Sequence, residues 1–302
     1  MSSCTLWSRS LPEPVFPDKR AVRRSFERAA AAYEGSAVLQ REVGQRLIEH
    51  LDPIRVEPVR VLDLGCGTGQ FFAPLGERFP RAQLVGLDLA HGMLLRARSR
   101  NAWWRRALDI RCARLVCADA ERLPLASACT GLVFSNLALQ WCRPELVFAE
   151  SARVLAPGGL FMFSTFGPDT LKELRAAFAA VDAEAHVNTF IDMHDLGDAL
   201  GHAGFADPVM EMEMVTLEYS SVETMARDLK AIGAHNSLPG RRRGLSGRRR
   251  WQRVVEHYEA KRRAGALPAT YEVIYGHAWK AAPRRTTEDG RQVIEFHPRG
   301  AR

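Results

Sequence analysis

The chain has 302 residues, of which 46% are hydrophobic and 25% are charged, and its formal net charge is +7. This composition is typical of a globular protein and excludes a disordered or low-complexity chain. No apolar run reaches the roughly 18 residues that a membrane-spanning helix needs, and the positive charge favours an acidic partner.

The N-terminal part of the chain precedes any strand signal. Residues 1–18 carry several serines and prolines but no apolar signal core, so we expect a flexible N-terminus. Helical spacing of apolar residues then predicts two helices before residue 59, with Ser36 as the N-cap of the second. The six cysteines form no C-x-x-C pair, which predicts reduced thiols, a cytoplasmic location and no metal site.

The segment VLDLGCGTG, Val61 to Gly69, is the most specific local signal in the chain. An apolar run that ends in an acid and breaks into three glycines predicts a buried strand, a tight turn and a helix. Glycine suits such a turn because the backbone takes unusual dihedral angles and a ligand can approach closely. The spacing is G-x-G-x-G, with Asp63 two residues before Gly65. This arrangement resembles motif I of the class I S-adenosylmethionine-dependent methyltransferases.

Two further predicted strands end in acids. Gln83 to Asp88 places a carboxylate 23 residues after Gly65 (88 − 65), where it can accept hydrogen bonds from both ribose hydroxyls of a nucleoside. The stretch from Leu115 to Ala120 contains the end of a third predicted strand and its acid, Asp119. This acid lies at the position where these methyltransferases contact the adenine amino group. A single acid of this kind is more often a helix cap or a surface residue. Three in this order predict a Rossmann-like core.

The second half of the chain continues this pattern with a fourth strand, a fifth strand and two helices, over residues 132–136, 160–165, 168–182 and 192–204. An alternating stretch from Val209 to Tyr219 predicts a half-buried strand. Its face with Met210, Met212 and Met214 is interpreted as flexible core filler. The last strand signal is Thr270 to Trp279.

The expected fold is therefore α/β, a Rossmann-like class I methyltransferase with a seven-stranded, mostly parallel sheet and an antiparallel last strand. About fifty residues, apparently helical in pattern, separate the sixth and seventh strands. We interpret them as an inserted cap that reads the acceptor. The expected parts are a flexible N-terminus (1–18), N-terminal lid helices (19–58), a cofactor-binding core (59–219), a helical cap (220–268), a final core strand (269–281) and a tail (282–302).

Two arginine triplets lie close together inside the expected cap: Arg241, Arg242 and Arg243, then Arg248, Arg249 and Arg250. A charged run of this kind is usually a solvated surface. As a binding site it suits an acidic protein or a phosphate-bearing carrier arm better than nucleic acid. Trp251 is the only aromatic ring in the run, so no base-stacking platform is visible.

Most of the chain, from about Lys19 to Lys280, resembles the malonyl-[acyl-carrier protein] O-methyltransferases of biotin synthesis. The segments that carry the resemblance are FERAAAAY (26–33), SNLALQW (135–141), FSTFGPDTLKELR (163–175), HVNTFIDMHDLGDAL (186–200), RDLKAIGAHN (227–236) and LPATYEVIYGHAWK (267–280). Methyltransferases of this kind often use an N-terminal helix as a lid over the cofactor, and the rings of Phe26 and Tyr33 suit that role.

The family methylates the free carboxylate of a malonyl thioester, and the resemblance implies this activity here, with an acidic acyl carrier protein or coenzyme A as the malonyl carrier. A carboxylate is ionised at neutral pH, so methyl transfer needs no general base. The enzyme has to align the carboxylate and balance its buried charge. Candidates for that task are Tyr33, Trp141, Arg175, Arg227, Lys230, His235 and Asn236, and the sequence does not choose among them.

The resemblance also implies contacts to the cofactor S-adenosyl-L-methionine. The expected residues are Asp63, Gly65, Gly67 and Gly69 around the methionine part, Asp88 at the ribose, Leu89 and Met93 beside the adenine, Asp119 and Ala120 at the adenine edge, and Asn136 and Gln140 in the pocket after the fourth strand.

Two alternatives stay open at this point. The second half also resembles a mitochondrial complex I assembly factor that is thought to hydroxylate an arginine of a partner protein, because both share GPDTLKELR-like and PATYEVIY-like segments. HVNTFIDMHD, KAIGAHN and the arginine loop favour the biotin enzyme, as does the lack of a clear transit peptide. Methylation of a quinone precursor or another small molecule is disfavoured because such enzymes need less of a cap.

Overall fold

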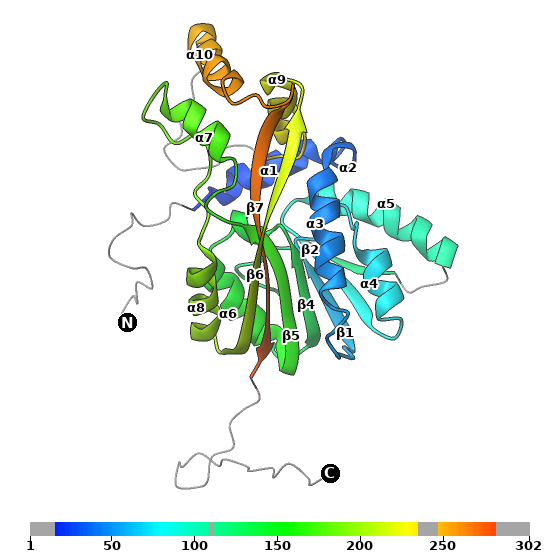
Figure 1. Cartoon of the computed structure of the whole chain (residues 1–302). Helices are drawn as coiled ribbons and strands as arrows, with labels where there is room; N and C mark the ends of the chain where they lie inside the picture. Colours follow the sequence, from blue (N-terminus) through cyan, green and yellow to red (C-terminus); the bar gives the residue numbers. More distant parts are fainter. Residues whose placement is uncertain (1–15, 109–111, 235–246, 282–302) are drawn as a thin grey trace.

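A seven-stranded sheet forms the centre of the computed structural model, which describes residues 16–108, 112–234 and 247–281. The strand order is β3-β2-β1-β4-β5-β7-β6 (Figure 1). The first five strands run parallel: β1 (Arg60–Leu64), β2 (Gln83–Asp88), β3 (Arg114–Cys117), β4 (Thr130–Asn136) and β5 (Leu155–Phe166). Strand β7 (Leu267–Lys280) is antiparallel to both β5 and β6 (Phe205–Tyr219). The predicted fold class is confirmed.

Helices cover both faces of the sheet because its strands are apolar on both sides. Leu132 and Phe134 of β4 pack into one core, and Val133 between them packs into the other. The first core is closed by α3 (Val38–Glu49), α4 (Phe72–Arg78) and α5 (His91–Leu108), and the second by α6 (Pro144–Val154) and α8 (Met193–His202). This doubly wound arrangement leaves the carboxyl ends of the strands as the open edge.

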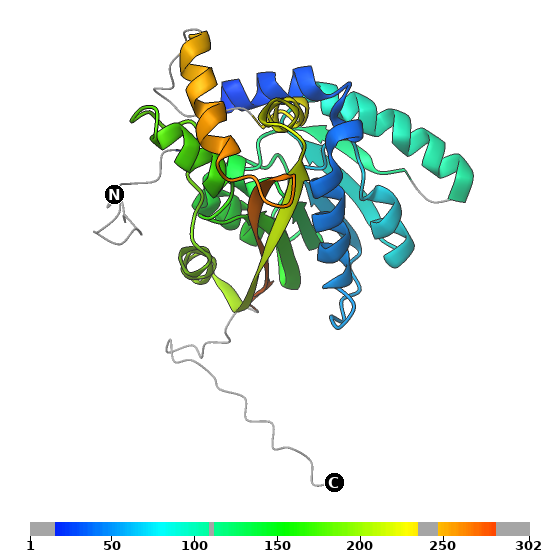
Figure 2. The same ribbon diagram turned by 45° about the horizontal axis from the view of Figure 1, so that its top comes forward.

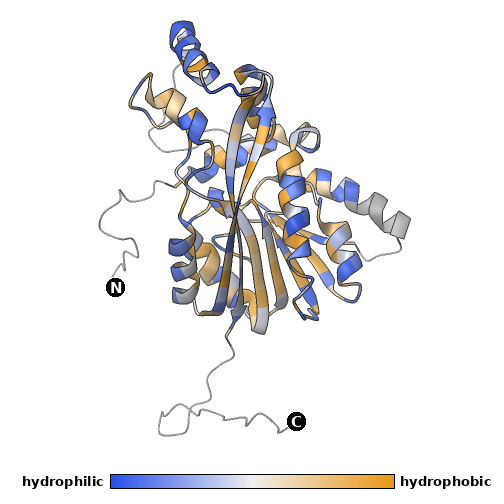
Figure 3. Cartoon of the chain, in the orientation of Figure 1, coloured by the Kyte–Doolittle hydropathy of each residue, from blue (hydrophilic) through white to orange (hydrophobic). Residues whose placement is uncertain are grey.

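A further group of helices lies over those carboxyl ends (Figures 1 and 2). It contains α1 (Lys19–Ala29), α2 (Tyr33–Ser36), the short helix η1 (Leu139–Trp141), α7 (Lys172–Ala179), α9 (Val222–Ala231) and α10 (Arg248–Glu259). The last two lie between β6 and β7, where the sequence predicts helices. Figure 3 shows α10 as largely hydrophilic beside the apolar sheet, and it buries only Val254 and Tyr258. Of the helices in the described ranges, none combines the length and apolarity needed to cross a membrane.

Two helix starts differ from the prediction. Ser36 does not cap α3, because it is the last residue of α2 and the N-cap position falls on Ala37, which makes no side-chain cap. The capping aspartate lies earlier, where Asp18 accepts hydrogen bonds from the first N–H groups of α1. Helix α7 begins only at Lys172, because the preceding Leu171 has a positive φ of 53° that interrupts the helix.

The methionine face of β6 is also placed differently from the prediction. Met212 and Met214 are 47% and 41% exposed, whereas Glu213 on the opposite face forms an ion pair with Arg46 of α3. Only Met210 packs against a core. The interpretation of this face as core filler is therefore wrong for two of its three methionines. An alternating pattern predicts two different faces of a strand but not which face packs against the protein. Here the face with the glutamates is turned towards helix α3.

Candidate active site

The glycine loop after β1 has the geometry that its sequence predicts. Gly65, Gly67 and Gly69 have φ angles of 77°, 53° and 73°, a region that favours glycine. A Cβ on Gly65 would lie 2.5 Å from the Cβ of Ala138, whereas a Cβ on Gly67 would point into open space. The backbone N–H groups of Gly65 and Cys66 donate to the carbonyl of Leu87 at 2.7 and 2.9 Å. The loop is thus tied to β2 and leaves room beside Gly67.

Asp63 is a buried acid for which the described residues provide no hydrogen-bond donor. Its side chain is 3% exposed, and its Oδ2 atom accepts no hydrogen bond. Burial, together with the nearby Asp88 carboxylate, raises the pKa of Asp63 to about 8. Such a group fits a cationic ligand atom, since an ammonium group supplies both the missing hydrogen bond and the opposite charge. The carboxyl group of Asp63, at the end of β1, therefore fits the amino-acid part of S-adenosylmethionine.

Asp88 ends β2 and is held by the backbone on both sides. Its Oδ2 accepts from the N–H of Gly67 at 2.9 Å and its Oδ1 from the N–H of Ala90 at 2.8 Å. Burial raises the pKa of Asp88 to about 6, and these hydrogen bonds limit the rise. The carboxylate has a fixed orientation and lines the same pocket as Leu89 and Met93, as expected for a ribose acceptor beside an adenine site.

Asp119 has a partner that the sequence analysis missed. The Nζ atom of Lys19, at the start of α1, lies 2.9 Å from Asp119 and 2.9 Å from Glu121, and it also lies 3.3 Å from the sulfur of Cys142. Burial alone would lower the pKa of Lys19, but these three neighbours raise it above its usual value. Lysine and aspartate are 100 residues apart, and no local motif links them.

Aromatic rings cover the site from the lid side. Phe26 lies 6.5 Å from Tyr33 and 5.4 Å from Trp141 between ring centroids, in edge-on contacts. Helix α1 is also fixed to α5, because the carboxylate of Glu27 accepts from the first two N–H groups of that helix, at His91 and Gly92, both at 2.7 Å. Of the helices predicted as a lid, α1 thus lies at the pocket, whereas most of α3 packs against the sheet.

One pocket brings most of the predicted residues together at the carboxyl ends of the strands, where doubly wound sheets bind ligands. Its lining includes Tyr33, Gly65, Gly67, Asp88, Leu89, Met93, Asp119, Ala120, Asn136, Gln140 and Trp141. Asp63 lines an adjoining pocket together with Gly65 and Gly67. Gly69 lines neither of the two. A Cβ there would lie 2.5 Å from the ring of Phe72, so this glycine allows α4 to pack closely.

A second group of lining residues comes from the later part of the chain. It consists of Phe166, Thr170, Leu171, Leu174, His186, Val187, Asn188, Phe190, Leu229, Ile232, Ala234 and Tyr271. These residues come from the end of β5, α7, the segment between α7 and α8, α9 with the residues after it, and β7. Most of this wall is apolar, which is suited to exclude water from a bound thioester.

Asn136 and Gln140 are both held by the protein. Asn136 donates to the carbonyl of Gln40 at 2.9 Å and accepts from the hydroxyl of Ser164 at 2.8 Å. Gln140 donates to the carbonyl of Leu137 at 2.6 Å. Their positions are therefore set before any ligand binds.

Several candidates for the substrate carboxylate do not reach the pocket. The guanidinium group of Arg175 donates to the carbonyls of Pro168 and Thr170 at 2.7 and 3.1 Å, and burial lowers its pKa. It fixes the start of α7 and does not line the pocket. Arg227 and Lys230 are exposed on α9 and do not line the pocket either. His235 and Asn236 lie outside the described residues, as do Arg241, Arg242 and Arg243.

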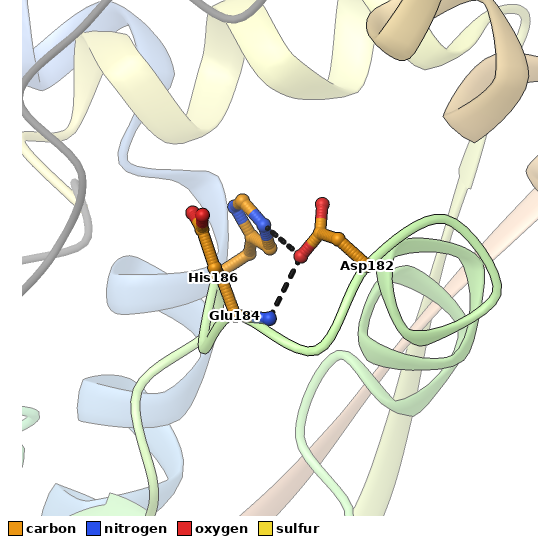
Figure 4. A group of neighbouring side chains, drawn as sticks. All are labelled: Asp182, Glu184 and His186. Atoms are coloured by element: carbon orange, nitrogen blue, oxygen red, sulfur yellow. Dashed lines mark hydrogen bonds and ion pairs between the residues drawn. The ribbon is translucent and has the colours of Figure 1, made fainter.

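A polar cluster next to the pocket was not predicted. Asp182, Glu184 and His186 lie close together in the segment between α7 and α8 (Figure 4). The guanidinium group of Arg250, from α10, donates to Asp182 through both Nε and Nη2 and lies 3.2 Å from Glu184. Arg250 is thus partly buried, unlike the exposed Arg248 and Arg249. Asp182 is the last residue of the helix expected over residues 168–182. No short sequence motif indicates that it contacts Arg250 of α10.

The fold and the pocket define a class I S-adenosylmethionine-dependent methyltransferase, and comparisons with known proteins agree. Residues 62–163 match the family profile of a methyltransferase domain. A putative methyltransferase from Bacillus halodurans C-125 shares the fold, with a TM-score of 0.57 at 17% identity over 79% of this chain and 100% of that chain.

Curated relatives identify the family. The malonyl-[acyl-carrier protein] O-methyltransferase of Laribacter hongkongensis is 55% identical over 95% of this chain and 99% of its own length. The protein of that name from Gallionella capsiferriformans is 54% identical over 92% of this chain and 96% of its own length. The chain belongs to the malonyl-[acyl-carrier protein] O-methyltransferase family. The predicted resemblance, enzyme class and cofactor are confirmed.

Proposed function

We propose that this protein transfers the methyl group of S-adenosylmethionine to the free carboxylate of a malonyl thioester. The product is the methyl ester, which has lost the negative charge and can start the pimeloyl chain of biotin. The observation that carries the proposal is the shared pocket. Residues of the cofactor motifs and residues of the segments that resemble the malonyl enzymes line the same space.

The chain's own residues have a limited chemical task in this reaction. When bound, S-adenosylmethionine supplies an electrophilic methyl group on a positively charged sulfur. The acceptor carboxylate is already ionised at neutral pH, so no residue has to remove a proton. Asp63, Asp88 and Asp119 would hold the cofactor, while Tyr33 and Trp141 would close the site against water. Positioning and exclusion of water then account for catalysis.

The malonyl carrier that we propose is an acyl carrier protein, which is strongly acidic. Arg248 and Arg249 are exposed at the start of α10, next to a segment, residues 235–246, that contains the first arginine triplet. Positive charge at this end of the cap would attract an acidic carrier. We also propose that residues 220–268 act as a cap over the acceptor, since Leu229, Ile232 and Ala234 line the pocket. The expected compartment is the cytoplasm.

The decisive experiment is methyl transfer from labelled S-adenosylmethionine to malonyl-acyl carrier protein, with acetyl-acyl carrier protein as the control that lacks a free carboxylate. We expect label on the malonyl form alone, in an ester that mild base releases. Equal labelling of both carrier proteins, or no labelling of either by protein that binds the cofactor, would contradict the proposal. Malonyl-coenzyme A in a parallel reaction separates recognition of the malonyl group from recognition of the carrier.

A further inference from the structure

A buried substrate carboxylate needs hydrogen-bond donors and positive charge. Within the described part of the chain, Lys19 and His186 are the basic side chains that line the pocket. The ammonium group of Lys19 is already shared between Asp119 and Glu121, at the predicted adenine edge. His186 belongs to the second group of lining residues, away from the cofactor motifs. It is the basic group that remains available to an acceptor.

The imidazole of His186 is held in place from two sides. Its Nε2 atom lies 2.9 Å from Oδ1 of Asp182, the oxygen that also accepts from the N–H of Glu184 at 2.8 Å (Figure 4). The ring stacks on Phe178 with 4.0 Å between centroids and 13° between planes. Arg250 holds the other oxygen of Asp182. Nη2 of Arg250 also lies 3.2 Å from Nε2 of His186. Both neighbours therefore meet the ring at Nε2, and Nδ1 is the nitrogen left for another partner.

Two polar groups on this wall lack a partner. No hydrogen bond to Nδ1 of His186 is present among the described residues. Asn188, two residues further on, is 8% exposed and lines the same pocket, and its Oδ1 atom has no partner. Its amide makes no hydrogen bond within the described residues. A buried amide without partners is costly, and this cost is relieved when a polar ligand binds.

The cluster beside His186 already contains a cation, the guanidinium group of Arg250. Asp182, Glu184 and His186 offer ligand atoms within 4.8 Å of one another, but the guanidinium group of Arg250 already lies among them. The guanidinium group already supplies the positive charge that a metal ion would bring. Nδ1 of the imidazole and the amide of Asn188, which presents two N–H groups, then remain for a ligand.

We propose that His186 and Asn188 bind the substrate carboxylate, with Nδ1–H of the imidazole and the amide N–H as donors to one of its oxygens. The other oxygen stays available to the methyl group. Asp182 and Arg250 are positioning residues, which hold the imidazole by Nε2 and connect the cap helix α10 to this wall. The inference rests on the proposed function, because it takes the acceptor to be a carboxylate.

Two substitutions of His186 separate its two nitrogens. The amide nitrogen of Gln takes approximately the place of Nε2, and that of Asn the place of Nδ1. We expect H186Q to raise the KM for malonyl-coenzyme A on the order of 10- to 100-fold, the effect of one lost hydrogen bond to a charged group. H186N should retain part of the activity because it keeps a donor towards the substrate. The affinity for S-adenosylhomocysteine should stay unchanged in H186Q and H186N. This measurement also shows that each variant is folded.

His194 is a matched control. Its Nδ1 lies 2.8 Å from Asp192, so it is also a histidine paired with an aspartate, but its side chain is 85% exposed and it does not line the pocket. We expect H194A to behave as the unchanged protein. A wild-type KM in H186Q, or equal losses in H186Q and H194A, would overturn the inference.

The same experiment separates this inference from the proposed function. If the unchanged protein methylates no malonyl thioester, the proposed function fails. If it does so and H186Q matches it, only the role of His186 fails. A further readout tests positioning: R250A should raise the KM for malonyl-coenzyme A and for malonyl-acyl carrier protein by the same factor. A loss confined to the carrier-protein substrate would place Arg250 on a docking surface instead.

Discussion

The two walls of the pocket are built in different ways. The cofactor wall consists of strand ends and the glycine loop, where backbone N–H groups orient Asp88 and positive φ angles make space. The acceptor wall consists of side chains from α7, α9, β7 and the segment between α7 and α8. The first wall depends on local backbone geometry, and the second depends on contacts between segments far apart in the chain. We therefore expect the first wall to serve any methyl acceptor and the second to select the acceptor.

The largest expected effect falls on the cofactor wall. Asp88→Ala removes the proposed ribose acceptor, and we expect affinity for S-adenosylhomocysteine to fall by at least about 100-fold, the effect of two lost hydrogen bonds to a charged group. Calorimetric titration measures this loss, and circular dichroism checks the fold. Asp198→Ala, an exposed aspartate on α8, is the control. Normal binding by the Asp88 variant would remove the ribose assignment.

The pKa of Asp63 makes the cofactor wall sensitive to pH. The folded, ligand-free protein holds a proton on Asp63 up to pH about 8, and the unfolded chain loses it near pH 4. Since the folded state binds more protons between these values, this group makes stability fall as pH rises from about 4 to 8.

Binding of an ammonium group favours the ionised form of Asp63. Affinity for S-adenosylhomocysteine should therefore rise with pH below about 8, by up to about tenfold per pH unit, and then level off. Asp63→Asn, measured by calorimetry at several pH values, should flatten this profile. If the affinity of Asp63→Asn for S-adenosylhomocysteine still rises with pH as steeply as in the unchanged protein, the proton belongs to another group.

A smaller effect is expected where the lid meets the cofactor wall. Lys19→Ala leaves Asp119 and Glu121 without their shared cation, and we expect affinity for S-adenosylhomocysteine to fall about three- to tenfold, as for one part-buried hydrogen bond. Lys172→Ala is the control, because Lys172 forms an exposed ion pair with Asp169 at 3.0 Å. Equal behaviour of the two variants would show that the lysine on α1 is not coupled to the site.

The smallest effect concerns the surface outside both walls. Replacing Arg248 and Arg249 by alanine should raise the KM for malonyl-acyl carrier protein a few-fold and leave malonyl-coenzyme A unaffected. The difference should shrink with added salt, because exposed charges are screened. The control changes Arg96 and Arg98, two exposed arginines of α5. If the two double variants lose the same activity, these arginines have no specific docking role.

The sequence predicted the cofactor wall because that wall follows from local rules. Parallel strands end at one edge of the sheet, so the acids near the ends of β1, β2 and β3 can be placed there without any knowledge of side-chain packing. The glycines of Val61 to Gly69 report the same edge. These signals are contained in short stretches of chain, and the residues that they indicate, except Gly69, do line adjoining pockets.

The acceptor wall could be predicted only as far as its segments. HVNTFIDMHDLGDAL was singled out for its resemblance, but the two side chains that we assign in it, His186 and Asn188, were not. The position of His186 depends on Asp182, which is held by Arg250 from 68 residues away. Arg250 looked like one of six surface arginines because a charge run does not show which member forms ion pairs within the protein. Such partners depend on tertiary packing and have no local signal.

The order of the sheet has a consequence for how the protein is made. Among the strands in the described ranges, β6 pairs only with β7, which lies between β6 and β5. During synthesis β6 therefore leaves the ribosome without a neighbour and waits until residues 267–280 follow it. Until then its long edge, with Met212 and Met214 exposed, is open to pairing with other chains. A nascent chain stopped before Leu267 lacks β7 and leaves β6 unpaired. The two strands that flank the cap helices α9 and α10 are therefore the last to join the sheet.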